Sequence, residues 1–206
     1  MLRIAVGVFA GGVVLFATAA DAPRSAAGIL SAQNAGGYVV MSEPDSHPWV
    51  ATFGSYLLCK TGDHAVTIKR VRYRTHVRPV DVGLVLREVG SDASVLVSAA
   101  GEPPDFVDPE GGTRHELNGA FKPLRAEQRI ERSCEGPRYK HGFTELLFVV
   151  KADRSGAVID QVRIDYVVGG YSGQYTIDLN GKMVLCGDAV GDDDIRAYCD
   201  DARSEG

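Results

Sequence analysis

The sequence has 206 residues, of which 45% are hydrophobic and 24% charged, and this balance excludes an intrinsically disordered chain. Its net charge of −5 argues against nucleic acid as a partner, because binding to phosphates needs positive charge.

Residues 1–20 have the pattern of a secretory signal peptide. Arg3 precedes an uncharged apolar run, which the small residues 17–20 close. We expect cleavage after Ala19 or Ala20, and therefore a secreted, extracellular protein. The alternative is a membrane anchor, but the apolar run is short for a spanning helix, which needs about 20 residues. No cysteine lies near the cleavage site to carry a lipid, so we expect no membrane span or anchor after cleavage.

Residues 21–48 are small and polar, with several glycines and prolines, and we expect a flexible spacer with one short strand at 38–41. From residue 49 to 186, short segments rich in valine, isoleucine, leucine and tyrosine alternate with turn residues. This pattern predicts an all-β domain, an antiparallel immunoglobulin-like β-sandwich of about seven to nine strands, with a small barrel as the alternative. The expected strands are 50–58, 66–77, 82–89, 94–98, 130–134, 143–151, 162–168, 175–179 and 183–186.

Residues 99–127 interrupt this pattern with prolines and glycines, and we expect a long loop there that is either a mobile insertion or a binding loop. Residues 187–206 are rich in aspartate and are expected to form a solvated acidic tail. Their spacing lacks the alternation of a calcium-binding loop, and the five histidines lie singly, so we expect no metal. No phosphate-binding glycine loop or nucleotide fingerprint predicts a cofactor.

Four cysteines follow the signal peptide, and an even number in an exported protein indicates two disulfides. Three connectivities are open. The segment between Cys186 and Cys199 closes easily, which favours that bridge and leaves Cys59 to pair with Cys134. A Cys59 to Cys186 bridge is the rival.

A row of cations recurs at every second residue of the strand 66–77 and just beyond it, and alternate residues of a strand point to the same face. One interpretation is an anion-recognising face, because guanidinium groups match carboxylate and phosphate. The other is a solvated face neutralised by cross-strand carboxylates such as Glu88, Asp165 or Asp178, or covered by the acidic tail. The row consists of Arg70, Arg72, Arg74, His76 and Arg78.

Several strand motifs together resemble a group of uncharacterised, exported, single-domain immunoglobulin-like proteins of high-GC Gram-positive bacteria. The resemblance covers residues 49–186 and implies a fold and an extracellular address, with no catalytic residues to carry over. The motifs that carry it are Tyr56-Leu57-Leu58-Cys59, Val66-Thr67-Ile68, Thr144-Glu145-Leu146-Leu147, Val162-Arg163-Ile164-Asp165-Tyr166 and Val184-Leu185-Cys186.

We therefore expect a secreted or cell-envelope-associated binding or accessory protein without enzymatic activity. Its partner would be an acidic polymer of the envelope or another exported protein. One alternative is a secreted hydrolase that uses the loop carboxylates Asp105, Asp108 or Glu110. Another is a structural domain that assembles through an edge strand.

Overall fold

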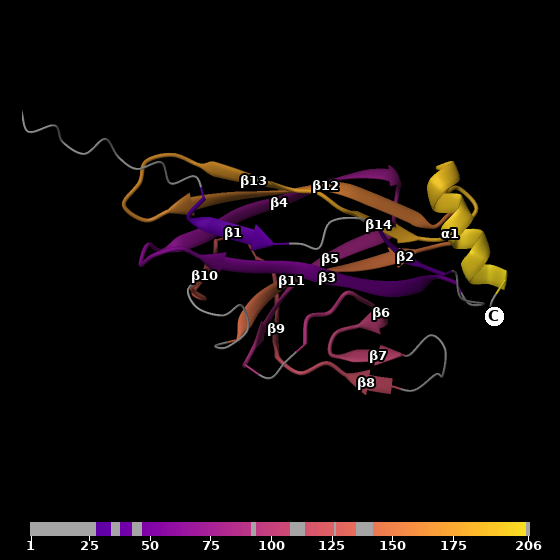
Figure 1. The fold of residues 1–206 in the computed structure, drawn as a ribbon, viewed down its shortest axis with the longest axis horizontal. Coiled ribbons are helices and arrows are strands. Elements are labelled where there is room, and N and C mark those ends of the chain that lie inside the picture. Colours follow the sequence, from indigo (N-terminus) through magenta and orange to yellow (C-terminus); the bar gives the residue numbers. More distant parts are fainter. Residues whose placement is uncertain are drawn as a thin grey trace, which may run out of the picture.

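The computed structural model describes residues 28–33, 38–42, 47–91, 94–107, 114–125, 127–134 and 142–204. The predicted signal peptide, residues 1–20, lies outside them. The described residues are predominantly β and form two antiparallel-rich sheets arranged as a sandwich (Figure 1). None of their helices is long and apolar enough to cross a membrane.

The first sheet has eight strands in the order β8-β7-β6-β3-β11-β5-β9, with β1 also paired to β3. Its strands are β1 (Leu30–Gln33), β3 (Trp49–Lys60), β5 (Asp81–Val89), β6 (Ser98–Glu102), β7 (Asp105–Val107), β8 (Arg114–Glu116), β9 (Ala120–Pro123) and β11 (Phe143–Ala152).

The second sheet has six strands in the order β10-β4-β12-β14-β2, with β13 also paired to β12. All its pairings are antiparallel except that of β2 with β14. Its strands are β2 (Tyr38–Met41), β4 (Val66–Val77), β10 (Gln128–Ile130), β12 (Ala157–Val168), β13 (Tyr175–Leu179) and β14 (Lys182–Leu185).

The hydrophobic core lies between the sheets, where alternate residues of both inner faces are buried. Phe148 of the first sheet is at its centre. The ring of Phe148 lies 5.4 Å from Tyr56 on its own sheet and 5.9 Å from Tyr73 on the opposite one. Burial raises the pKa of the Tyr56 hydroxyl to about 12.

β11 is buried on both faces, as its apolar sequence predicts. Its outer face carries Glu145, which lies in register opposite Arg87 of β5. Arg87 Nη1 donates to Glu145 Oε2 at 2.9 Å, and both side chains are almost fully buried. Arg87 also donates to the carbonyls of Ser94 and Asn118, so this ion pair holds two connecting segments against the outer face.

The other oxygen of Glu145 accepts hydrogen bonds from the backbone N–H groups of Ser55 and Leu96. Burial raises the pKa of Glu145. The hydrogen bonds from Ser55, Arg87 and Leu96 oppose that shift, because they stabilise the charged carboxylate. Gly54 allows the backbone of β3 to lie close to these groups. A Cβ at this position would lie 2.4 Å from the Leu96 carbonyl and 2.7 Å from Glu145 Oε1.

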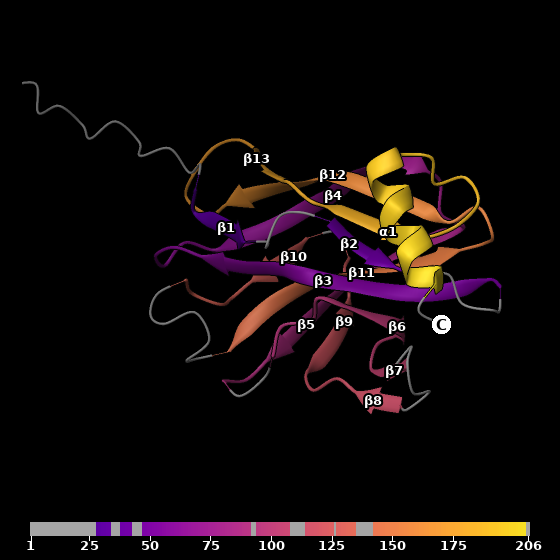
Figure 2. The same cartoon turned by 45° about the vertical axis from the view of Figure 1, so that its right-hand side comes forward.

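Two predicted segments have more regular structure than expected. Within residues 21–48, the strand at 38–41 is present, but β1 is also a strand and Leu30 is in the core, so these parts are not a flexible spacer. Within 99–127, where a loop was expected, β6, β7 and β8 extend one edge of the first sheet beyond β3, and β9 pairs with β5 at the other edge (Figure 2). The strand predicted at 94–98 is instead β6, which begins at its last residue.

The predicted acidic tail contains a helix, α1 (Asp193–Ser204). Ile195 and Cys199, one helical turn apart, are buried against Val158 and Val184 on the outer face of the second sheet. Figure 1 shows α1 beside β2 and β14, and Figure 2 shows it beside β2. The sequence did not predict this helix, because the segment is rich in aspartate and few of its residues are apolar.

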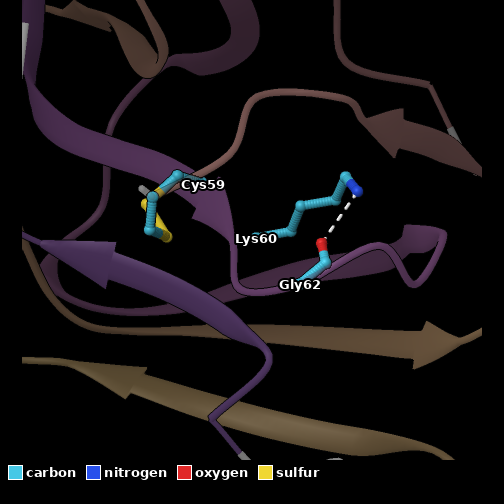
Figure 3. The surroundings of a disulfide bond; sticks show 4 residues. Cys59, Lys60 and Gly62 are labelled. Carbon is cyan, nitrogen blue, oxygen red and sulfur yellow. Dashed lines mark hydrogen bonds between the residues drawn. A yellow bond between two sulfur atoms is a disulfide. The ribbon is translucent and has the colours of Figure 1, made fainter. Parts of the chain in front are cut away.

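Two disulfides join Cys59 to Cys134 and Cys186 to Cys199, which confirms the favoured connectivity over its rival. The first fixes the end of β3 to the segment that follows β10, where Lys60 also pairs with Ser133. Figure 3 shows this region, including the hydrogen bond from Lys60 Nζ to the Gly62 carbonyl. The second bridge attaches α1 to the end of β14.

The buried ion pair leads to a stability prediction. Arg87→Met leaves the Glu145 charge buried without its partner and should lower the free energy of unfolding by about 3–5 kcal/mol in urea titrations. The matched control is Lys122→Met, which removes an exposed pair with Glu88 and should cost less than about 1 kcal/mol. Equal losses in the two variants would contradict the structural role of Arg87.

The two disulfides should contribute unequally, because they close loops of different length. The Cys59–Cys134 bridge spans 75 residues and the Cys186–Cys199 bridge spans 13. Replacing both cysteines of each bridge by alanine should lower stability by about 4.5 and about 3 kcal/mol respectively in the chain-entropy model. Thermal unfolding of the two double variants measures the order, and a reversed order would count against loop closure as the main effect.

Candidate anion-binding face

The predicted row of cations lies on the outer face of the second sheet, on β4. Val66 and Ile68 at the start of this strand point into the core. The pairing with β12 then shifts at Lys69, since Ile68 pairs with Tyr166 but Arg70 pairs with Asp165. This β-bulge puts the following even-numbered residues, Arg70, Arg72 and Arg74, outside. All three are exposed, as the alternation predicted.

A second shift ends the row. Thr75 pairs with Ile159 and Val77 with Val158, so His76 is the extra residue. Val77 therefore packs on the outer face, against the cluster beneath α1. Simple alternation along the strand would place Val77 on the core side. Arg78 follows the end of the strand and is out of phase with the row. We define the arginine face as Arg70, Arg72, Arg74 and His76 of β4 with Arg163 of β12.

Asp160 is the main carboxylate below this face, with its side chain only 8% exposed. Arg74 donates to it from both Nε and Nη2, each at 2.9 Å, and His76 Nε2 lies 2.9 Å from the same carboxylate. The hydrogen bond from Arg74 is the largest cause that lowers the pKa of Asp160 to about 2.

Asp165, five residues further along β12, is the second buried carboxylate below this face. It accepts hydrogen bonds from Arg72 Nη2 at 2.6 Å and from Thr176 at 2.9 Å. Arg72 is the largest cause that lowers the pKa of Asp165, and Arg70 contributes through its charge. Arg70 itself forms no ion pair within the described part of the chain.

Two of the three carboxylates suggested by the sequence lie on this face. Asp165 neutralises Arg72, whereas Asp178 of β13 pairs with Arg163 instead of a residue of the row. Glu88 was wrongly placed, because it lies on the first sheet and pairs with Lys122. In the predicted acidic tail, Asp192 pairs with Lys182. Helix α1 contacts β2, and Ile195 and Cys199 pack in the cluster that Val77 joins at the end of β4.

A third register shift between β4 and β12 determines which residues lie opposite each other at the centre of the arginine face. Asp160 pairs with Arg74 and Arg163 pairs with Arg72, so β12 uses two residues, Gln161 and Val162, opposite one of β4. Gln161 takes up the bulge with φ at +48°, a left-handed conformation that is unfavourable for a residue with a side chain. As a result, Arg72 and Arg163 lie directly opposite each other.

These residues surround an open hollow of about 410 Å³. Around it lie three arginines, one carboxylate and two amides: Arg72, Arg74, Arg163, Asp178, Gln161 and Asn180. Four arginines and three aspartates on the whole face leave it positive even with His76 neutral. The face can therefore donate many hydrogen bonds to an anion.

The sequence did not single out Asp160, Gln161 or Arg163 as site residues. Arg163 lies in the strand predicted at 162–168, whereas Asp160 precedes that strand and shares its face only because of the bulge at Gln161. Regular alternation places residues 160 and 163 on opposite faces. No sequence signal marks a bulge formed by glutamine, since glycine is the usual residue with positive φ.

Comparisons with protein-family models, with curated proteins and with solved structures found no match. Among the described residues, no group of three or more histidines, cysteines and acidic residues is arranged to hold a metal ion. Of the carboxylates considered for hydrolysis, Asp105 is exposed on the short strand β7, and Asp108 and Glu110 lie outside the described residues.

The Asp160 cluster leads to a prediction about acid stability. The folded pKa of Asp160 lies below its unfolded value, so its contribution is present above about pH 4 and is lost as pH falls towards 2. Asp160→Asn should lower stability at pH 7 by about 1 kcal/mol, because its partner Arg74 is half exposed. The difference from the wild type should shrink between pH 4 and 2 in denaturant titrations, and a constant difference would contradict it.

Proposed function

We propose that the protein is an exported binding or accessory protein, an immunoglobulin-like sandwich that recognises an anionic group through the arginine face. The observation that carries this proposal is the direct opposition of Arg72 and Arg163 beside a hollow. Directly opposite residues of paired strands have Cβ atoms about 4.5–5.5 Å apart, and like charges there are destabilising. An anion bound between the two guanidinium groups removes that repulsion.

The hydrogen bonds of the two arginines leave donors available. Arg72 uses Nη2 on Asp165 and Arg163 uses Nε on Asp178, out of five N–H donors on each guanidinium. Both side chains are about half exposed, at 47% and 48%. Their carboxylates thus orient them without occupying the remaining N–H groups, which suits recognition of a carboxylate or phosphate.

An ion-pair ladder with no ligand is the competing interpretation, and the strained bulge argues against it. Without the extra residue in β12, Val162 would lie opposite Arg72 and the two arginines would not meet. A left-handed glutamine costs on the order of 1 kcal/mol or more, and such strain concentrates at functional sites. The bulge also brings Asp160 to the face beside Arg74, and the opposition of Arg72 and Arg163 that comes with it is what a bound anion would relieve.

The proposed location outside the cell rests on the signal-peptide pattern at residues 1–20. It is supported by the two disulfides, which are typical of extracellular proteins. The proposed partners are accordingly an acidic polymer of the cell envelope or an acidic surface of another exported protein.

The test is a titration of the chain from Asp21 onward with inorganic phosphate, followed by NMR of the arginine Nε–H groups. We expect saturable shifts at Arg72 and Arg163, and none at Arg125, an exposed arginine beyond β9 on the first sheet. The double variant Arg72→Gln/Arg163→Gln should lose the response, whereas Arg125→Gln should keep it. Shifts that do not saturate, or that are equal at all exposed arginines, would refute the anion site.

A further inference from the structure

We infer that the hollow beside Arg72 and Arg163 takes an acidic saccharide, a sugar that carries a carboxylate beside its hydroxyl groups. This inference rests on the proposed anion-binding function and concerns the class of ligand. It follows from the mixture of donors and acceptors around the hollow. A site for a fully ionised anion such as sulfate alone needs only donors, because sulfate offers only acceptors.

Asp178 orients Arg163, but its second carboxylate oxygen has no role in a simple anion site. Its side chain is 62% exposed at the rim, and its Oδ1 accepts the hydrogen bond from Arg163. Its other oxygen receives no hydrogen bond from the described residues. A carboxylate in this place repels a fully ionised anion such as sulfate, but it accepts a hydrogen bond from a sugar hydroxyl.

Gln161 is the second such residue. The bulge exposes it beside the hollow, and its side-chain amide forms no hydrogen bond within the described residues. An amide donates and accepts, so it complements a hydroxyl group, which does the same. Asn180 supplies another amide to the lining from the turn between β13 and β14.

The size of the hollow agrees with this ligand. Its volume of about 410 Å³ lies within the range of about 300–1,000 Å³ of small-molecule sites. Because the hollow is open, a sugar can enter it as one unit of a longer chain. The carboxylate of that unit would lie between Arg72 and Arg163, with its hydroxyl groups towards Gln161 and Asp178.

Calorimetric titration of the chain from Asp21 onward with a panel of sugars tests the inference. The panel contains short oligomers of galacturonate, glucuronate and mannuronate, their neutral counterparts, and inorganic phosphate. We expect at least one uronate oligomer to bind about tenfold more tightly than both its neutral counterpart and phosphate. If phosphate binds as tightly as every uronate oligomer, the ligand class is wrong although the anion site stands. If neither phosphate nor any uronate binds, the proposed function itself fails.

Two variants separate the saccharide contacts from anion binding. Gln161→Gly keeps the left-handed backbone and removes the amide, so it should weaken uronate binding roughly fivefold without weakening phosphate binding or lowering stability. Asp178→Ala removes an acceptor and a repulsive charge, so the ratio of uronate to phosphate affinity should fall. Arg125→Gln, on the other sheet, is the control and should change neither affinity. Unchanged uronate affinity in Gln161→Gly would overturn the inference.

Discussion

The pairing of β4 with β12 is the constraint on which the rest of the second sheet depends. Each of these strands has twelve residues, and together they carry core side chains on the inner face and charged ones on the outer face. A regular ladder keeps one alternation from end to end. Three register shifts break it here, so the same strand that buries Ile68 exposes Arg70, and the same strand that buries Ile159 exposes Arg163. The position of every charge on the arginine face follows from those shifts.

The two sheets differ in how far their ion-paired arginines are buried. On the first sheet, Arg87 and Glu145 are withdrawn from water and satisfied by backbone groups, so their ion pair fixes the segments that cover the outer face. On the second sheet, the carboxylates of Asp160 and Asp165 are buried while their arginine partners stay half exposed. A buried pair of this kind cannot exchange partners without a large penalty, whereas an exposed guanidinium group can. Only the second arrangement is suited to binding a ligand from solution.

The carboxylates of the arginine face have a structural and a functional consequence. They offset the repulsion within the row, which supports the interpretation of a neutralised outer face for Arg74 in particular. They also hold Arg72 and Arg163 in fixed orientations, which would lower the entropy that the proposed anionic ligand must remove on binding. Neutralisation and recognition are therefore compatible at neighbouring positions of one strand.

The sequence by itself predicted most of the longer strands and favoured the observed disulfides. Alternation predicted β4 and β13 with their observed bounds, and the short segment between Cys186 and Cys199 favoured the observed bridges. These features depend on local periodicity and short loop closure, which a sequence contains. It did not reveal α1, β1 or the strands within 99–127, because those elements are held by packing and pairing with distant residues. Tertiary structure alone decided that Arg163 faces Arg72 and that Arg78 leaves the row, since a single bulged residue reverses the side on which all later side chains lie.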